Sequence, residues 1–322
     1  MKRTKKGWFR ASVVASLASV MILAPARAQE SSWRANHDAG WKAYQEGRLS
    51  EADTLLRAAA KEARAFGTRD LRVALTLDHL AWVFCAEGKF TDAEPLARWA
   101  LKSREELLGP VHQEVAESLN TLACLCDAQG KLADAEPCYR RCLALEEKLR
   151  GPEHPNVAAL LDNLATVYHG QGKFNEAEPF YKRVLAIREK ANAPADLAPT
   201  VFNLATLYLD QDRFDQAEPL YKRALTLRQQ ALGPDHVEVA ASLDGLGWLY
   251  VSQKRLDLAE PLYKRALTIV EQPSCRDTPT AANVQEHYAA LLRKLGREPE
   301  AAALEGRARA IRTNQGRATA SR

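Results

Sequence analysis

The tripeptide Ala-Glu-Pro recurs along this chain at a nearly constant spacing. Its copies begin at Ala93, Ala135, Ala177, Ala217 and Ala259, with successive spacings of 42, 42, 40 and 42 residues. Weaker copies at Ala52 and Ala301 extend the pattern to seven repeats. Self-similarity at such a period is typical of a solenoid, in which each repeat buries its apolar face against its neighbours. We therefore expect stacked repeats and no independent core.

Residues 197–232 show what one repeat contains. Val201, Leu204, Ala205 and Tyr208 recur at the spacing of an amphipathic helix. Residues 211–213 interrupt the pattern, and a second helix is expected to open at Asp215. An oxygen-bearing side chain followed three residues later by an acid is typical of a capping box, which satisfies free N–H groups at a helix start. This pairing occurs at Asp215/Glu218, Ser50/Asp53, Thr91/Glu94, Asn175/Glu178 and Asp257/Glu260.

Small residues recur on both helices of each repeat. Gly or Ala stands in the first helix, 12 residues before the Ala that recurs at the start of the second helix. Closely crossing helices leave no room for larger side chains at such positions. These first-helix residues are Gly40, Ala81, Ala123, Ala165, Ala205, Gly247 and Ala289.

The resulting pattern resembles the tetratricopeptide repeat. Residues 163–168 (Asn-Leu-Ala-Thr-Val-Tyr), Gly172, Ala177 and Tyr181 match it position by position. The 42-residue period and a Gly-Pro-x-His linker, at residues 109–112, 151–154 and 233–236, resemble the longer repeats of kinesin light chains. The resemblance implies an all-α fold, a right-handed α-solenoid of seven helix-turn-helix repeats. Those repeats span roughly 33–67, 71–109, 113–151, 155–192, 196–233, 237–272 and 279–312.

The resemblance weakens at both ends, where Ala97 and Glu305 replace the expected aromatic residue. No heptad coiled coil precedes the repeats, so the motor role of kinesin light chains is not carried over.

The first 28 residues read as a cleaved signal peptide. A basic segment is followed by the apolar run 11–23 and by Ala26-Arg27-Ala28. The alternative is an uncleaved helix that tethers the chain to a membrane, although the run is short for a span. We expect an exported protein, periplasmic or secreted from a bacterium, with a solenoid over residues 29–312.

Removal of that segment changes the charge balance. The whole chain has 45 Lys+Arg and 41 Asp+Glu, and six of the basic residues lie in positions 1–28 with no acid. Residues 29–322 are therefore nearly neutral, which does not favour nucleic-acid binding. Paired basic residues on the second helices follow a Glu by four positions, the favourable arrangement for a solvated helix surface. Residues 313–322 are expected to form a disordered basic tail.

Six cysteines, at positions 85, 124, 126, 138, 142 and 275, leave three interpretations open. Four of the six, at 124, 126, 138 and 142, fall within one repeat, on expected helices, at positions where other repeats carry Leu, Ala, Tyr or Val, which favours buried thiols. One disulfide and a four-thiolate metal site remain as alternatives.

The resemblance also predicts where a ligand binds, because the first helices of tetratricopeptide repeats line a concave groove. Asn side chains can bond both N–H and C=O groups of an extended peptide, and Trp offers rigid contact area. The alternatives are that a Trp covers the end of the core and that an Asn bonds within the helix array. The predicted groove residues are Trp41, Asp78, Trp82, Asn120, Asp162, Asn163, Phe202, Asn203, Asp244 and Trp248.

No pattern of catalytic residues is apparent. The sequence has no Gly-rich phosphate loop, no nucleophile elbow and no HExxH motif. The linker histidines recur at equivalent places, which indicates a structural role rather than metal binding or catalysis. His169 is expected near the groove, but a lone histidine is weak evidence for either of these activities. We expect a non-enzymatic scaffold that binds a protein or peptide, with no cofactor, no metal, no nucleic acid and no membrane anchor after cleavage. The second hypothesis is a structural spacer or self-assembling element without a groove ligand.

Overall fold

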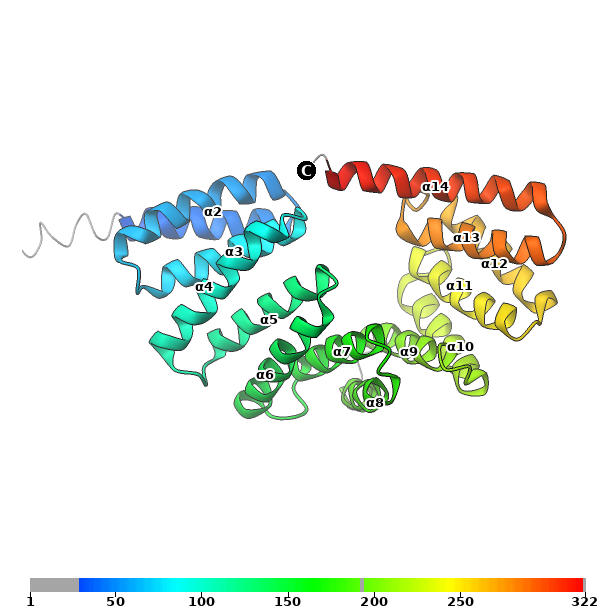
Figure 1. Cartoon of the computed structure of the whole chain (residues 1–322), viewed down its shortest axis with the longest axis horizontal. Coiled ribbons are helices and arrows are strands. Elements are labelled where there is room, and N and C mark those ends of the chain that lie inside the picture. Colours follow the sequence, from blue (N-terminus) through cyan, green and yellow to red (C-terminus); the bar gives the residue numbers. More distant parts are fainter. Residues whose placement is uncertain (1–28, 192–193, 321–322) are drawn as a thin grey trace, which may run out of the picture. The chain divides into compact units, whose positions relative to one another are not determined.

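The computed structural model describes residues 29–191 and 194–320, and over these ranges every regular element is a helix (Figure 1). Apolar stripes at helical spacing account for this result, because each stripe can be buried only against another helix. The chain divides into two compact units, one ending at Gln129 and one beginning at Gly130, and each is described by itself.

Unit 1 contains three first helices and two second helices. Its first helices are residues 29–45, α3 (Leu71–Ala86) and α5 (Gln113–Ala128). Its second helices are α2 (Leu49–Ala63), which ends in the short 3-10 helix η1 (Arg64–Phe66), and α4 (Phe90–Leu108). Here "first" and "second" give a helix's place in its repeat.

Unit 2 begins with a second helix and then contains four complete pairs. Its first helices are α7 (Pro155–Gly170), α9 (Pro194–Leu209), α11 (Val237–Ser252) and α13 (Pro279–Lys294). Its second helices are α6 (Leu132–Arg150), α8 (Phe174–Lys190), α10 (Phe214–Leu232), α12 (Leu256–Val270) and α14 (Glu298–Ala320).

Helices pack mainly on their neighbours in the chain. In unit 1, α3 packs on α4 and α4 on α5; in unit 2 the same order runs from α6 to α14. First helices also contact the next first helix, as α11 does with α13. The all-α solenoid of stacked helix pairs is thus confirmed within each unit.

The small residues lie where the two helices of a pair cross. A Cβ added to Gly40 would come within 2.9 Å of Leu56 Cγ, and one added to Gly247 would come within 2.9 Å of Tyr263 Cζ. Ala165 and Ala177 are both fully buried. Larger side chains at these positions would push the helices apart, which explains why only Gly and Ala occur there.

The turn within each pair requires a left-handed residue. Gly88 and Gly172 have φ of 75° and 72° in that turn. Asp212 and Lys254 occupy the equivalent place with φ of 56° and 61°. A side chain is strained in this region, more so for Lys than for Asp.

The capping-box prediction for the second helices is wrong. These helices begin one residue earlier, as α10 does at Phe214, and the N-cap is a basic residue, Arg213, with no side-chain capping bond. Asp215 therefore lies inside the first turn, where its charge favours the helix N-terminus. Glu218 instead accepts a hydrogen bond from Tyr250 OH of the next repeat and pairs with Lys222 on its own helix, so its carboxylate is engaged away from the helix start.

The structural role of the linker histidines is confirmed. His112, His154 and His236 are the N-caps of α5, α7 and α11, and each Nδ1 accepts a hydrogen bond from the backbone N–H two residues later, at 3.1–3.2 Å. The preceding Gly109, Gly151 and Gly233 end the second helices with φ of 80°, 91° and 89°. The linker therefore ends one helix and caps the next.

Two expectations concern the ends of the chain. The predicted signal peptide, residues 1–28, lies outside the described residues. Helix α14 continues to Ala320 and so includes most of the segment for which the sequence suggested disorder. None of the helices within the described ranges is both long and apolar enough to cross a membrane.

Candidate functional site

Asp78, assigned to the groove by register, is buried between helices of unit 1. It is 3% exposed, and its Oδ2 lies 3.0 Å from Nη1 of Arg104, which is fully buried on α4. Arg104 also donates to Ser118 Oγ on α5, at 2.7 Å. Burial raises the pKa of Asp78 to about 6, against the opposing charge of Arg104. Asp78 therefore joins α3 to α4, and its carboxylate is too buried to contact a ligand.

Asp162 has the same arrangement in unit 2. Its Oδ2 lies 2.8 Å from Nη1 of Arg188 on α8 and accepts a hydrogen bond from Thr200 Oγ1 on α9, at 3.2 Å. In the same register position of unit 1, Asn120 is half-buried, and its Oδ1 accepts a long hydrogen bond from the Cys124 thiol, at 3.8 Å.

Phe202 takes this register position on α9 and also faces an arginine. The guanidinium carbon of Arg228 lies 4.8 Å from the centre of the Phe202 ring, and Tyr221 meets that ring edge-on. Arg228 donates to Ser242 Oγ on α11, at 2.9 Å. The sequence analysis missed this recurring arginine. Its signal was present, since Arg104, Arg188 and Arg228 each stand 26 residues after the register position.

Asp244 and Trp248 on α11 both contact His287 on α13. His287 Nδ1 lies 2.9 Å from Asp244 Oδ1, and its ring stacks on Trp248 with centres 4.7 Å apart. Burial opposes protonation of His287, but the hydrogen bond and charge of Asp244 raise its pKa overall. His287 was not predicted, because a lone histidine has no recognisable spacing to its partners.

Asn163 and Asn203 differ from these residues. They occupy equivalent places on α7 and α9 and are half-buried. Within the part of the chain that the structure describes, no side-chain hydrogen bond of either amide is observed. Their donors and acceptors are therefore available to another molecule.

Trp41 and Trp82 lie on neighbouring first helices of unit 1 and are both half-buried. The Trp41 ring stacks on His79 at 3.8 Å and on Tyr44 at 4.9 Å between centres. Burial lowers the pKa of His79 to about 3, so its imidazole is neutral at physiological pH. Trp41 thus belongs to a partly exposed aromatic surface that spans two helices.

The second helices carry a charged surface whose acids bridge successive repeats. The predicted pairs four residues apart are confirmed, for example Glu178–Lys182 at 2.6 Å and Glu260–Lys264 at 2.9 Å. In addition, Glu178 accepts a hydrogen bond from Tyr208 OH, at 2.9 Å, and pairs with Arg213, at 2.6 Å. Both partners belong to the next repeat. The same bridge joins Glu136 to Tyr168 and Lys173, and Glu218 to Tyr250 and Arg255.

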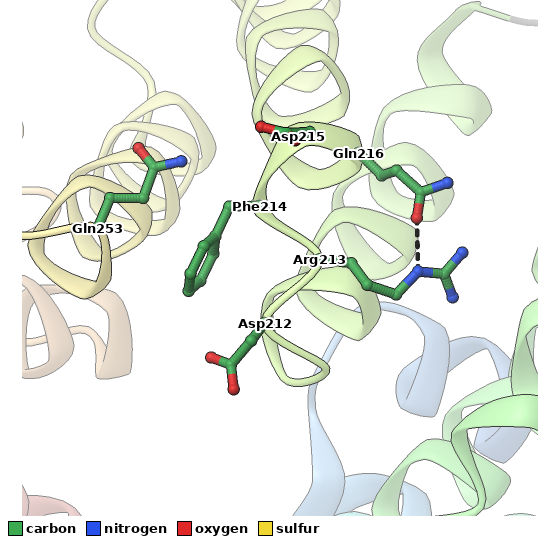
Figure 2. A pocket seen from close by; sticks show the side chains of 6 residues that line it. All are labelled: Asp212, Arg213, Phe214, Asp215, Gln216 and Gln253. Atoms are coloured by element: carbon green, nitrogen blue, oxygen red, sulfur yellow. Dashed lines mark hydrogen bonds between the residues drawn. The ribbon is translucent and has the colours of Figure 1, made fainter.

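One cavity lies apart from the predicted groove residues. Figure 2 shows it beside the turn between α9 and α10, lined by residues 212–216 and by Gln253. Its volume is 370 Å³. Arg213 in its wall already bonds Gln216 and Glu178, so the cavity is bordered by side chains engaged in packing the repeats.

The cysteines are buried or half-buried, as expected of small apolar side chains. Cys126, Cys142 and Cys275 are buried, and Cys85, Cys124 and Cys138 are half-buried. Among the described residues, no group of three or more potential ligands is arranged to hold a metal ion.

The fold and these surfaces define an all-helical repeat protein whose first helices offer unbonded amides and partly exposed aromatic rings. Profiles described as tetratricopeptide repeat match residues 73–114, 100–148, 114–190 and 196–272. The chain belongs to the tetratricopeptide repeat family. None of the curated proteins compared with the sequence matches it.

Solved structures with the same fold include kinesin light chain-like proteins. BtubC (BKLC) from P. vanneervenii has 25% identity and a TM-score of 0.55, over 71% of this chain and 91% of that one. A putative kinesin light chain from Podosopora anserina has 21% identity and a TM-score of 0.55, over 62% and 95%. A Rap protein complexed with competence and sporulation factor has 16% identity and a TM-score of 0.62, over 93% and 81%.

Proposed function

We propose that this chain is a non-catalytic scaffold that binds an extended peptide, or a helix, of a protein partner on the surface of its first helices. Tetratricopeptide repeats commonly bind proteins, and the Rap protein of similar fold is complexed with a factor. The observation that best supports the proposal is the pair Asn163 and Asn203. Two half-buried amides without hydrogen bonds, one repeat apart, suit the backbone of an extended chain.

The proposed location is outside the cytoplasm, periplasmic or secreted. This rests on the basic, apolar and Ala-x-Ala segments of residues 1–28. N-terminal sequencing of protein recovered from the extracytoplasmic fraction tests it. A mature chain that begins at Gln29 supports export, and a chain that retains Met1 in the cytosol contradicts it.

The binding experiment starts with peptides selected from a random library on the wild-type protein. Their affinity is then measured by calorimetry for the double variant Asn163→Ala/Asn203→Ala and for a control, Asn175→Ala, an exposed residue on α8. Loss of two hydrogen bonds is expected to weaken binding by about tenfold or more. Helicity is expected to stay unchanged. Equal affinities for the double variant and the control would contradict the proposed surface.

The second candidate, a spacer that stacks between molecules without a ligand, is separable by sedimentation. Monomeric protein that forms a defined complex with a selected peptide favours the scaffold. Concentration-dependent assembly without peptide binding favours the spacer.

A further inference from the structure

His287 extends the row of Asn163 and Asn203 within unit 2. Both asparagines stand two residues before the small residue at the helix crossing of their first helix, and His287 does so on α13. The first helices of this unit pack in the order α7, α9, α11 and α13, so residues at one register position share one face. Gly245 holds this position on α11 and adds no side chain between them. Because the His287 side chain is 36% exposed, this face carries an imidazole in line with the two amides.

Asp244 determines which nitrogen of His287 faces solvent. Its two carboxylate oxygens lie 2.9 and 3.0 Å from Nδ1, and the ring stacks on Trp248. A carboxylate only accepts hydrogen bonds, so Nδ1 carries the donated proton. Among the described residues no hydrogen bond of Nε2 is observed. Nε2 therefore offers a lone pair when the imidazole is neutral and an N–H donor when it is protonated.

The groups packed around His287 favour its protonated form. Burial opposes the charge, whereas the hydrogen bond and charge of Asp244 on α11 raise the pKa. Glu286 on α13 also raises this pKa and Arg312 on α14 lowers it, and these two side chains pair with each other at 3.1 Å. On α12, burial raises the pKa of the Tyr263 hydroxyl, which stays neutral. Overall the pKa of His287 is raised from 6.5, so mild acidification is enough to give the imidazolium.

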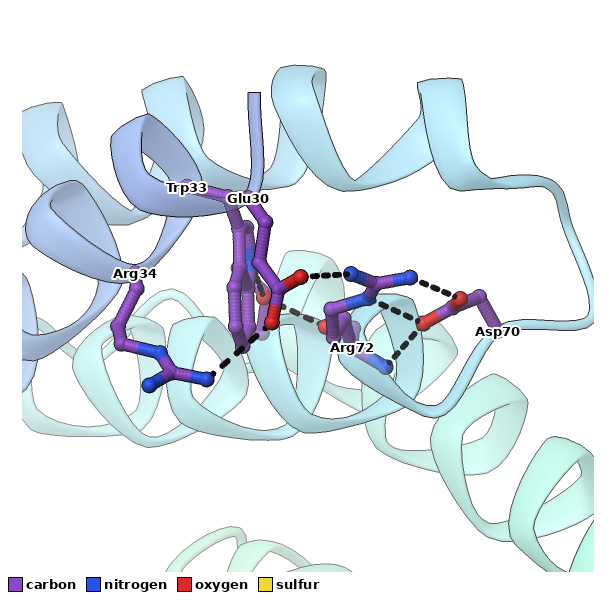
Figure 3. Close-up of polar contacts among 6 residues, drawn as sticks. Glu30, Trp33, Arg34, Asp70 and Arg72 are labelled. Atoms are coloured by element: carbon purple, nitrogen blue, oxygen red, sulfur yellow. Dashed lines mark hydrogen bonds and ion pairs between the residues drawn. The ribbon is translucent and has the colours of Figure 1, made fainter. Parts of the chain in front are cut away.

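Unit 1 contains a similar stack without the acid. The Trp41 ring stacks on His79, at 3.8 Å between centres, and His79 also stacks on His37, at 4.9 Å. Trp33 stacks on His37 in turn, and the guanidinium carbon of Arg72 lies 6.0 Å from the centre of the Trp33 ring (Figure 3). Burial is the main cause that lowers the pKa of His79 to about 3. In unit 2 a carboxylate stands at the register position of His37, and the shift has the opposite direction.

We propose that His287 is a third partner-binding residue on the first-helix surface of unit 2, and that its protonated Nε2 donates a hydrogen bond to a backbone carbonyl of the bound peptide. This inference rests on the proposed function and deepens it by naming a regulation of that surface. A hydrogen bond from a charged donor is stronger than one from a neutral group, and the neutral ring would present a lone pair to the same carbonyl. Acidification is therefore expected to tighten binding. The contact is complete below the ordinary pKa of 6.5 and is lost as pH rises through the raised value.

The first measurement follows the histidine ring resonances of the free protein by NMR between about pH 5 and 9. The resonance missing from His287→Gln identifies this residue. Its midpoint is expected above 6.5, and Asp244→Asn is expected to lower it by about one pH unit or more. His79 is expected to keep the chemical shift of a neutral ring throughout. A His287 midpoint below 6.5, or one that a folded Asp244→Asn variant leaves unchanged, would overturn the proposal.

The second measurement is the affinity of peptides selected from a random library at about pH 6, with blocked ends and no ionisable side chains. Calorimetry on the wild type is expected to show binding at least about fivefold tighter at about pH 6 than at about pH 8.5. His287→Gln is expected to lose this difference.

The matched control is His236→Asn, at the exposed N-cap of α11, because Asn keeps a capping acceptor while removing a histidine. This variant is expected to retain the pH dependence of the wild type. Circular dichroism checks that each variant is folded. Wild-type pH dependence in His287→Gln, or its loss in the control as well, would contradict the assignment to His287.

Failure of this inference is distinguishable from failure of the proposed function. Peptides that bind the wild type equally at both pH values, and are still weakened by Asn163→Ala/Asn203→Ala, overturn only the role of His287. Absence of peptide binding at either pH overturns the scaffold and this inference together.

Discussion

Glu178 provides the sharpest test of how successive repeats are held together. Its carboxylate on α8 accepts from Tyr208 OH on α9, at 2.9 Å, and pairs with Arg213 at the start of α10, at 2.6 Å. Lys182, on its own helix, lies 2.6 Å away. Glu178→Gln keeps the shape and one acceptor oxygen but removes the charge, so it tests the charged contacts between repeats separately from packing.

The hydrogen bond from Arg213 is the largest effect that lowers the pKa of Glu178, from 4.5 to about 2, and burial opposes it. A pKa difference of this size corresponds to about 3 kcal/mol. The side chains of Arg213 and Lys182 are 33% and 58% exposed, so water screens both charges. After this screening we expect Glu178→Gln to lower the free energy of unfolding by about 1–2 kcal/mol.

Urea denaturation followed by far-UV circular dichroism measures this effect. The control is Glu176→Gln on the same helix, an exposed residue whose side chain lacks a hydrogen bond within the described residues. The control is expected to change stability by less than about 0.5 kcal/mol. Because the pKa of Glu178 is lowered in the folded state, its stabilisation is complete above the unfolded value and is lost as pH falls from 4.5 to about 2. Equal midpoints for the two variants, or a difference that persists at the acidic end, would refute the bridge.

Three further predictions concern the packing and the turns. Ala165→Leu, at a buried helix crossing, is expected to lower the free energy of unfolding by about 1–3 kcal/mol through overpacking. Its control, Ala186→Leu on the exposed side of α8, is expected to be nearly neutral. Thermal denaturation measures both variants. Lys254→Gly relieves a left-handed backbone, so we expect it to raise the free energy of unfolding by about 0.5–1 kcal/mol, and a destabilised variant would contradict this. His112→Ala removes the capping acceptor of Glu114 N–H and is expected to cost about 1 kcal/mol, with unchanged urea midpoints as the contrary result.

The repeats were predictable from the sequence because they depend on periodic, local features. The buried Ala165 and the capping His112 recur at fixed positions, and the stacking of helix pairs leaves them few alternatives. The same regularity gives Asn163 and Asn203 equivalent places on α7 and α9.

Sequence reasoning fell short where side chains bond a different helix. Glu218 sits at the spacing of a capping box, yet it bonds Tyr250 in the next repeat, 32 residues away. Asp78 has the register of a groove residue, but Arg104 from the second helix draws it into a buried ion pair. Neither Tyr250 nor Arg104 is close in sequence to the acid that it bonds. A flexible side chain can reach several neighbouring groups, and the sequence does not show which one it bonds. The repeat register predicts the backbone position of a residue, but the orientation of its side chain depends on the charged groups that surround it.

The central claim is that the first helices bind a partner peptide. Hydrogen-exchange mass spectrometry on the free protein and on its complex with a library-selected peptide tests this directly. The account predicts slower exchange on binding in α7 and α9, which carry the two amides, with little change in α8 and α10. Protection confined to α8 and α10, or no change in any helix of the complex, would contradict it.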